Sequence, residues 1–237
     1  MIFEKIAVAL IRAAPKGYYR LARGLRSVWP SLRECRVETR YGSMVCDIAD
    51  GGCFPLVKFG GYPHWAEDEI AIAALPLDKH SLVVDVGANI GATVLLFSKL
   101  AGSVIAFEPS PKALKLLNLN VPANAIVYPV ALSDFEGSAV FEERDSLDLS
   151  SFSDQGITVP VRTLDSFGLQ PDLIKIDVEG FEPQVLRGAT ETLKYRPIVI
   201  FEALNEEAVK LCRAELPDGY EIARISKFNY LASPMTT

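Results

Sequence analysis

The stretch SLVVDVGANIG (Ser81–Gly91) joins a run of apolar residues to a turn that contains two glycines. A helical stretch, GATVLLFSKLAG, follows the turn. This order is typical of a buried strand that leads into a helix. Because glycine lets the backbone approach a ligand closely, the first question is which ligand the turn holds.

The alternation of apolar runs and helical stretches continues along the chain. NEEAVKLCRAEL is predicted to be a late helix, and YEIARIS and NYLAS a closing antiparallel pair. Near-continuous Val, Ile and Leu strands between helices predict a doubly wound, Rossmann-like α/β sheet over residues 76–237. Its other strands are predicted at SVIAFEP, AIVYPVALSD, TVPVRTLD, DLIKID and RPIVIFEA, and its other helices at PKALKLLNLNV and EPQVLRGATETL.

Residues 1–75 are predicted to form an N-terminal helical and hairpin extension, suited to act as a lid or a partner contact. Residues 1–30 have a helical pattern, and Arg36–Ile48 alternates like a hairpin. Asp50–Pro63 is rich in Gly and Pro and is predicted as loops around a short apolar segment. Ala66–Leu75 is predicted to be a helix whose acidic first turn suits the helix dipole.

Charge is distributed unevenly over the 237 residues. The net charge of −6 argues against general nucleic-acid binding, which needs a basic surface. Residues 1–40 nevertheless carry nine Lys and Arg against three Glu, a net of +6, so the remainder carries −12. This basic segment is either the solvated outer face of a helical extension, which we take as the default, or a peripheral contact with an anionic membrane or a partner.

The termini and cysteines bear on location. No window approaches the ~18 apolar residues that span a bilayer, and the first residues lack the pattern of a secretory signal. The cysteines form no CxxC pair and no zinc spacing, so we expect reduced thiols in a cytoplasmic protein. They are Cys35, Cys46, Cys53 and Cys212.

The glycine turn is poorly built for phosphate. A dinucleotide fingerprint needs a middle glycine, but Ala88 and Asn89 stand between Gly87 and Gly91. A phosphate-binding loop needs a Lys directly after its last glycine, and Gly91 is followed by Ala92. A nicotinamide-dependent oxidoreductase is therefore disfavoured, and binding of reduced nicotinamide dinucleotide would revive it.

Two carboxylates favour a ligand with a ribose and a positive charge. Glu108 ends the next strand, about twenty residues after the turn, where a carboxylate accepts hydrogen bonds from ribose hydroxyls. Asp85 lies directly before the turn and suits a cation such as a sulfonium or amino group. The alternative for Asp85 is a purely structural role, capping or orienting the loop.

Several ordered blocks then resemble the FkbM family of S-adenosylmethionine-dependent methyltransferases. They are VVDVGANIGATVLLFSK, VIAFEPSPKALKLLNLN, ALSDFEG, VPVRTLDSF, DLIKIDVEGFEPQVLRGA and IVIFEA, within Gly61–Ala203. The resemblance implies a class I methyltransferase fold and S-adenosylmethionine as cofactor. It implies that Asp177 faces the methyl donor and the acceptor, and that Glu108 binds the ribose. It further places Gly87, Ala88, Asn89 and Gly91 around the methionine part and Ala131, Leu132 and Ser133 along the adenine.

Acidic residues at two strand ends are the main catalytic candidates. Alternation along KIDVEG sends Lys175 and Asp177 to the same side of the sheet. Asp177 and Glu179 can share a proton, bind a divalent cation or hold a sugar hydroxyl, although Glu179 can instead cap the following helix. Glu202 ends another strand at the same edge. Asp177, Glu179 and Glu202 are therefore candidate Mg²⁺ ligands, and the spacing leaves the metal open.

One histidine is a candidate base. His64, in GYPHW, precedes the core where a lid can fold over the site, and the alternative is a loop histidine without chemistry. Beside it, Tyr62 and Trp65 suit stacking on a sugar, or equally anchoring of the extension.

The sequence thus predicts an S-adenosylmethionine-dependent O-methyltransferase. The implied acceptor is a hydroxyl of a sugar, glycan or polyketide-type small molecule. The alternative is a non-catalytic methyltransferase-fold module for binding or assembly. N-methylation, metal dependence and oligomeric state stay open.

Overall fold

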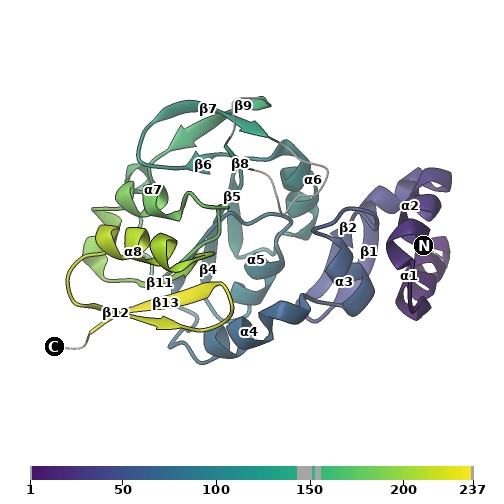
Figure 1. Ribbon diagram of the computed structural model, residues 1–237, viewed down its shortest axis with the longest axis horizontal. Helices are drawn as coiled ribbons and strands as arrows, with labels where there is room; N and C mark the ends of the chain where they lie inside the picture. Colours follow the sequence, from purple (N-terminus) through teal and green to yellow (C-terminus); the bar gives the residue numbers. More distant parts are fainter. Residues whose placement is uncertain (1, 143–150, 153–155, 236–237) are drawn as a thin grey trace.

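Seven strands form the central sheet of the computed structural model, which describes residues 2–142, 151–152 and 156–235. Their order is β12-β13-β11-β10-β3-β4-β5 (Figure 1). β13 is antiparallel to both of its neighbours, whereas β11, β10, β3, β4 and β5 are parallel. The strands are β3 (Leu82–Val86), β4 (Ser103–Phe107), β5 (Ala125–Tyr128), β10 (Leu173–Ile176), β11 (Ile198–Glu202), β12 (Tyr220–Arg224) and β13 (Asn229–Pro234).

Helices follow β3, β4, β10 and β11, as the alternating pattern predicts. Side chains of α6 and α7 are buried against the sheet, which explains why the strands are mostly apolar. α6 begins where the Ser110 hydroxyl accepts a hydrogen bond from the Ala113 amide, with Pro111 in the first turn. The predicted doubly wound fold is confirmed. The helices are α5 (Ala92–Phe97), α6 (Pro111–Asn120), α7 (Glu182–Arg187) and α8 (Glu206–Glu215).

A second, four-stranded sheet differs from the prediction. AIVYPVALSD is not one strand, because Pro129 lacks an amide hydrogen and ends β5. The chain then enters β6 (Ala131–Leu132), which pairs with β9 (Ile157–Arg162) outside the central sheet. β7 (Gly137–Glu142) and β8 (Ser151–Phe152) complete this sheet at the top of Figure 1. TVPVRTLD is therefore a strand, but in the second sheet.

The N-terminal extension contains the predicted helices and hairpin, and one further helix. α3 replaces the expected loops because Pro55 lies in its first turn and Gly60 ends it with left-handed backbone. Helices α1 and α2 lie at the edge of the molecule farthest from β12 (Figure 1). The extension comprises α1 (Ile2–Ala13), α2 (Tyr18–Val28), β1 (Cys35–Thr39), β2 (Gly42–Cys46), α3 (Phe54–Phe59) and α4 (Ala66–Ala73).

Asn120, at the end of α6, fastens the hairpin to the glycine turn. Its side-chain oxygen accepts from the Val45 amide at 2.6 Å, and its nitrogen donates to the carbonyls of Val45 at 3.0 Å and Ile90 at 2.9 Å. Ile90 and Ala92 also pack in the same apolar core as the extension. The extension thus supports the turn directly.

Two smaller findings concern the helices and the cysteines. Among the described residues, no helix combines the length and apolarity that crossing a membrane requires. All four cysteines are buried and unpaired.

Candidate active site

The glycine turn after β3 is held by its neighbours in the sheet. The amides of Gly87 and Ala88 donate to the Phe107 carbonyl, and Gly87 has a φ of 84°. A Cβ on Gly87 would lie 1.8 Å from the carbonyl oxygen of Asp177, so only glycine fits between the two strand ends. Asn89 also has left-handed backbone, with a φ of 49°. The turn is therefore a fixed cradle in which backbone lies against the end of β10.

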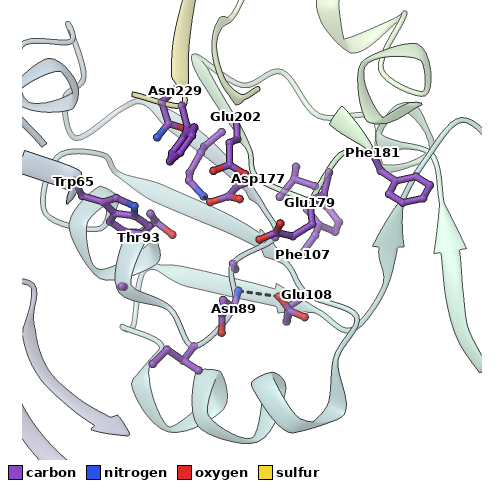
Figure 2. A pocket seen from close by; sticks show the side chains of 18 of the residues that line it. Trp65, Asn89, Thr93, Phe107, Glu108, Asp177, Glu179, Phe181, Glu202 and Asn229 are labelled. Atoms are coloured by element: carbon purple, nitrogen blue, oxygen red, sulfur yellow. Dashed lines mark hydrogen bonds and ion pairs between the residues drawn. The ribbon is translucent and has the colours of Figure 1, made fainter. Parts of the chain in front are cut away.

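Glu108 lies directly after β4 and faces the turn. Its Oε2 accepts from the Asn89 amide and its Oε1 from the Ser110 amide, both at 2.8 Å (Figure 2). The residue is only 6% exposed, and it lines a cavity of about 380 Å³ at this edge of the sheet. A carboxylate oxygen can accept more than one hydrogen bond, so a carboxylate at this position suits a ligand that carries hydroxyl groups.

Lys175 lies buried between two carboxylates. Its Nζ is 3.1 Å from Asp177 Oδ2 and 3.7 Å from Asp85 Oδ1, and 5.9 Å from the centre of the Trp65 ring. Burial lowers the pKa of Lys175, but Asp177 and Asp85 more than offset it, so the pKa is raised above its ordinary value. Lys175 is therefore a fixed ammonium that lines the cavity, and it is not a proton acceptor.

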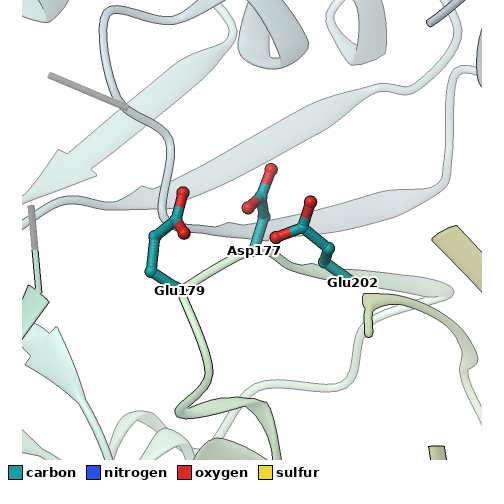
Figure 3. Close-up of side chains that lie close together, drawn as sticks. All are labelled: Asp177, Glu179 and Glu202. Carbon is teal, nitrogen blue, oxygen red and sulfur yellow. The ribbon is translucent and has the colours of Figure 1, made fainter. Parts of the chain in front are cut away.

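Three carboxylates gather where β10 and β11 end. One oxygen each from Asp177, Glu179 and Glu202 lie within 4.8 Å of one another, and Figure 3 shows the side chains pointing together. Burial, followed by repulsion from Asp177 and Glu179, raises the pKa of Glu202 to about 8. This set is called the acid cluster below.

Glu179 is not the N-cap of the following helix, because Phe181 holds that position and α7 has no side-chain capping hydrogen bond. The Glu182 carboxylate, in the first turn of α7, accepts from the amides of Val178 and Gly180 at 3.0 and 3.2 Å and so fixes the loop before the helix. Glu179 instead has left-handed backbone, with a φ of 54°, which turns its side chain toward Asp177 (Figure 3). A non-glycine residue in this conformation is costly, and such strain is concentrated at functional sites.

Most of the residues predicted for the site line this one cavity. The catalytic candidates Asp177, Glu179, Lys175 and His64 all do so, although His64 is exposed and packs edge-on against Tyr62. The other predicted residues in the lining are Glu202, Gly87, Ala88, Asn89, Glu108, Ala131 and Leu132.

Three predicted cofactor residues lie behind the cavity wall. Asp85 is fully buried, accepts a hydrogen bond from the Thr93 hydroxyl, and faces the cation of Lys175 rather than a ligand. Gly91 faces Leu117, because a Cβ there would lie 2.7 Å from Leu117 Cδ1. Ser133 is buried, and its amide donates to the Arg162 carbonyl of the second sheet. These three residues are not among those that line the cavity, and their contact with a ligand stays a prediction.

Other lining residues were not predicted. Lys227 and Phe228 come from the turn between β12 and β13, and Asp68 comes from α4. Both oxygens of Asp68 are buried without a hydrogen-bond partner in the described chain. Asn229, at the start of β13, lies above Trp65 and beside Glu202 (Figure 2). Residues 205–237 carry no motif, so only the fold brings them to the cavity.

The fold and the cavity together define the class of protein. Five parallel strands closed by an antiparallel last strand, with a carboxylate after β4, form a class I S-adenosylmethionine-dependent methyltransferase fold. Residues 85–225 match the methyltransferase FkbM domain, and the chain belongs to this family of S-adenosylmethionine-dependent methyltransferases. The family resemblance seen in the sequence is thereby confirmed.

Individual relatives are more distant. Hexuronic acid methyltransferase AglP of Haloferax volcanii is 30% identical over 148 residues, which are 57% of this chain and 61% of AglP. Precorrin-6y C5,15-methyltransferase from Geobacter metallireducens superposes with a TM-score of 0.46 at 16% identity, over 69% of this chain and 86% of that one. An rRNA methylase from Streptococcus thermophilus gives 0.45 at 16% identity, over 74% and 98%.

Proposed function

We propose that the protein methylates a hydroxyl group of a sugar or glycan. The observation that carries this proposal is the acid cluster in the cavity wall, beside the glycine turn. Clustered carboxylates disfavour a second carboxylate as the reacting group beside them, and they supply a base for a neutral hydroxyl. Because a hydroxyl must lose its proton to such a base, we favour O- over N-methylation.

The residues that line the cavity fit S-adenosylmethionine in the arrangement that the sequence predicts. Gly87, Ala88 and Asn89 are assigned to the methionine part of the cofactor. Their turn presents backbone groups to the cavity and has no lysine that could bind a phosphate. Glu108 is assigned to the ribose, with one oxygen for each hydroxyl. Ala131 and Leu132 would cover the adenine with apolar surface. The volume of about 380 Å³ lies in the range of small-molecule sites.

Glu202 is assigned as the general base, because burial and repulsion from Asp177 raise its affinity for a proton. S-adenosylmethionine supplies a methyl group that its sulfonium already activates. Glu202 accepts the hydroxyl proton while the methyl carbon exchanges its bond to sulfur for a bond to the acceptor oxygen. The products are a methyl ether and S-adenosylhomocysteine, and the protein contributes mainly positioning and proton removal.

A carbohydrate acceptor is supported by the other wall of the cavity. Trp65 offers a flat apolar face, and Asp68 offers buried acceptor oxygens for sugar hydroxyls. Lys227 lines the same cavity and suits the carboxylate of an acidic sugar. AglP acts on hexuronic acid by name, which is consistent with a uronate-containing acceptor here.

Mg²⁺ is the second occupant that the acid cluster fits, since three carboxylates within 4.8 Å form a donor set of oxygens. We favour the base over the metal because the Lys175 ammonium already lies 3.1 Å from Asp177 and neutralises part of the cluster. A bound Mg²⁺ would need to compete with this fixed cation.

The product and its metal dependence test the proposal together. With labelled S-adenosylmethionine and oligosaccharides containing uronic acids, we expect an alkali-stable methyl ether, formed equally with Mg²⁺ and with excess EDTA. An alkali-labile methyl ester would overturn the hydroxyl assignment. Loss of turnover in EDTA that only added metal restores would make the acid cluster a metal site.

The ribose assignment is tested by replacing Glu108 with alanine. We expect calorimetric titration with S-adenosylhomocysteine to show an affinity about 10- to 100-fold weaker, because two hydrogen bonds to a charged group are lost. Glu191→Ala is the matched control and should leave the affinity unchanged, because Glu191 is exposed and, within the part of the chain that the structure describes, forms an ion pair only with Lys194. Thermal denaturation checks that both variants are folded.

Equal affinity of Glu108→Ala and the unaltered protein would remove Glu108 from the cofactor site. Reduced nicotinamide dinucleotide is the ligand control for both proteins. Its binding in place of S-adenosylhomocysteine would contradict the cofactor assignment as a whole.

A further inference from the structure

The outer face of α1 is apolar. Phe3, Ile6 and Leu10 follow the helical spacing of one face and are 65%, 51% and 48% exposed. Ala7 and Ile11, on an adjacent face, are buried in the core of the extension. The sequence led us to expect a solvated, basic face here, so this exposed apolar surface requires its own explanation.

The end of α2 enlarges this surface. Val28 is 66% exposed and Trp29 43%, and the Trp29 ring stacks on Phe3 with ring centres 6.2 Å apart. The five residues Phe3, Ile6, Leu10, Val28 and Trp29 are called the apolar face below. Contiguous exposed apolar surface of this kind marks an interaction site more often than scattered single residues do.

Basic side chains lie on the same two helices and directly beside them in the sequence. Arg12 and Arg26 are used inside the fold, because Arg12 donates to the carbonyls of Val57 and Glu38 and Arg26 pairs with Asp47. The others are exposed and form no ion pair among the residues that the structure describes. They are Lys5, Lys16, Arg20, Arg23 and Arg33.

We propose that α1 and α2 dock the protein on an anionic membrane surface, with the apolar face inserted at the headgroup level and the basic side chains on the lipid phosphates. An apolar strip with Trp and Phe, on helices that also carry exposed Lys and Arg, is the pattern of helices that lie in a membrane interface. A second copy of the chain fits less well, since it would bring two segments of net charge +6 together. This inference is independent of the acceptor and adds a partner to the proposed function.

Vesicle co-sedimentation of the full chain tests the proposal. We expect binding to vesicles with one third phosphatidylglycerol, much weaker binding to pure phosphatidylcholine, and loss of binding at high salt. Ile6→Ser with Leu10→Ser should weaken binding by about tenfold or more, and Arg20→Glu with Arg23→Glu by a similar factor. Both pairs are exposed and lie outside the cavity, so affinity for S-adenosylhomocysteine should not change.

Matched controls lie elsewhere on the molecule. Ile70→Ser with Leu211→Ser makes the same change at two exposed apolar helix positions, and Lys79→Glu with Lys99→Glu makes the same charge change. Neither should alter vesicle binding by more than about twofold. The proposal is overturned if the protein ignores anionic vesicles, or if sedimentation velocity shows a stable dimer that Ile6→Ser with Leu10→Ser dissociates.

Discussion

Replacing Glu202 with glutamine is expected to lower kcat/KM by about 100- to 10,000-fold, the usual contribution of a general base. Glutamine keeps the size of the side chain and a hydrogen-bonding oxygen but cannot accept the hydroxyl proton. Because the change lies at the end of β11 and away from Glu108, affinity for S-adenosylhomocysteine should remain within about threefold. Initial rates with labelled methyl donor and calorimetry measure the two quantities separately.

The Glu202 carboxylate also sets the pH dependence of kcat/KM. The pKa of Glu202 is raised to about 8, so the group is protonated and unable to act as a base at lower pH. We expect kcat/KM to fall about tenfold for each pH unit below 8 and to level off above it. Glu202→Gln should lack this slope.

Glu179→Gln is the matched control, since Glu179 belongs to the same acid cluster but is exposed. Its loss should reduce the rate much less than the loss of Glu202. If Glu202→Gln keeps both the rate and the slope, then another group in the cavity is the base, and His64 is the first to test.

Replacing Lys175 with methionine is expected to lower the free energy of unfolding by about 3–5 kcal/mol, the cost of removing one partner from a buried ion pair. Lys175 and Asp85 are almost completely buried, and the remaining acceptors would face no cation. Urea denaturation followed by circular dichroism measures the change. Loss of the ion pair with Asp177 contributes much less to this loss of stability, because the Asp177 side chain is 27% exposed.

Adding Asp85→Asn to Lys175→Met should restore most of the lost stability. The amide oxygen of asparagine can still accept from Thr93, and the double variant buries no uncompensated charge. A single variant as stable as the unaltered protein would mean that Lys175 does not neutralise the interior carboxylates.

The central sheet was predictable because its information is local. A strand buried on both faces is a short run of Val, Ile and Leu, and Leu82–Val86 and Ile198–Glu202 carry that signal in their own letters. Pro129 was the overlooked signal, since a residue without an amide hydrogen breaks a strand. The second sheet depends on pairing between β6, with two residues, and β9, some twenty-five residues later, which no local pattern encodes.

The residues of the site also divide into those that the sequence could predict and those that it could not. Gly87, Glu108 and Asp177 lie at strand ends, and the carboxyl ends of neighbouring parallel strands meet at one edge, so their proximity follows from the fold class. The role of Asp85 does not follow, because its cation, Lys175, comes from a strand ninety residues later in the chain. Lys227 and Asp68 reach the cavity from elements without motifs, and only the assembled structure places them there.

The contacts of Asn120 limit how this protein can be divided or recombined. One side chain joins the hairpin, α6 and the glycine turn. The parts before and after residue 76 can therefore not be exchanged independently of each other. A hairpin borrowed from another family member would have to present its backbone groups to this amide in the same register. The extension and the turn therefore constrain each other's evolution, and the site inherits its shape from both.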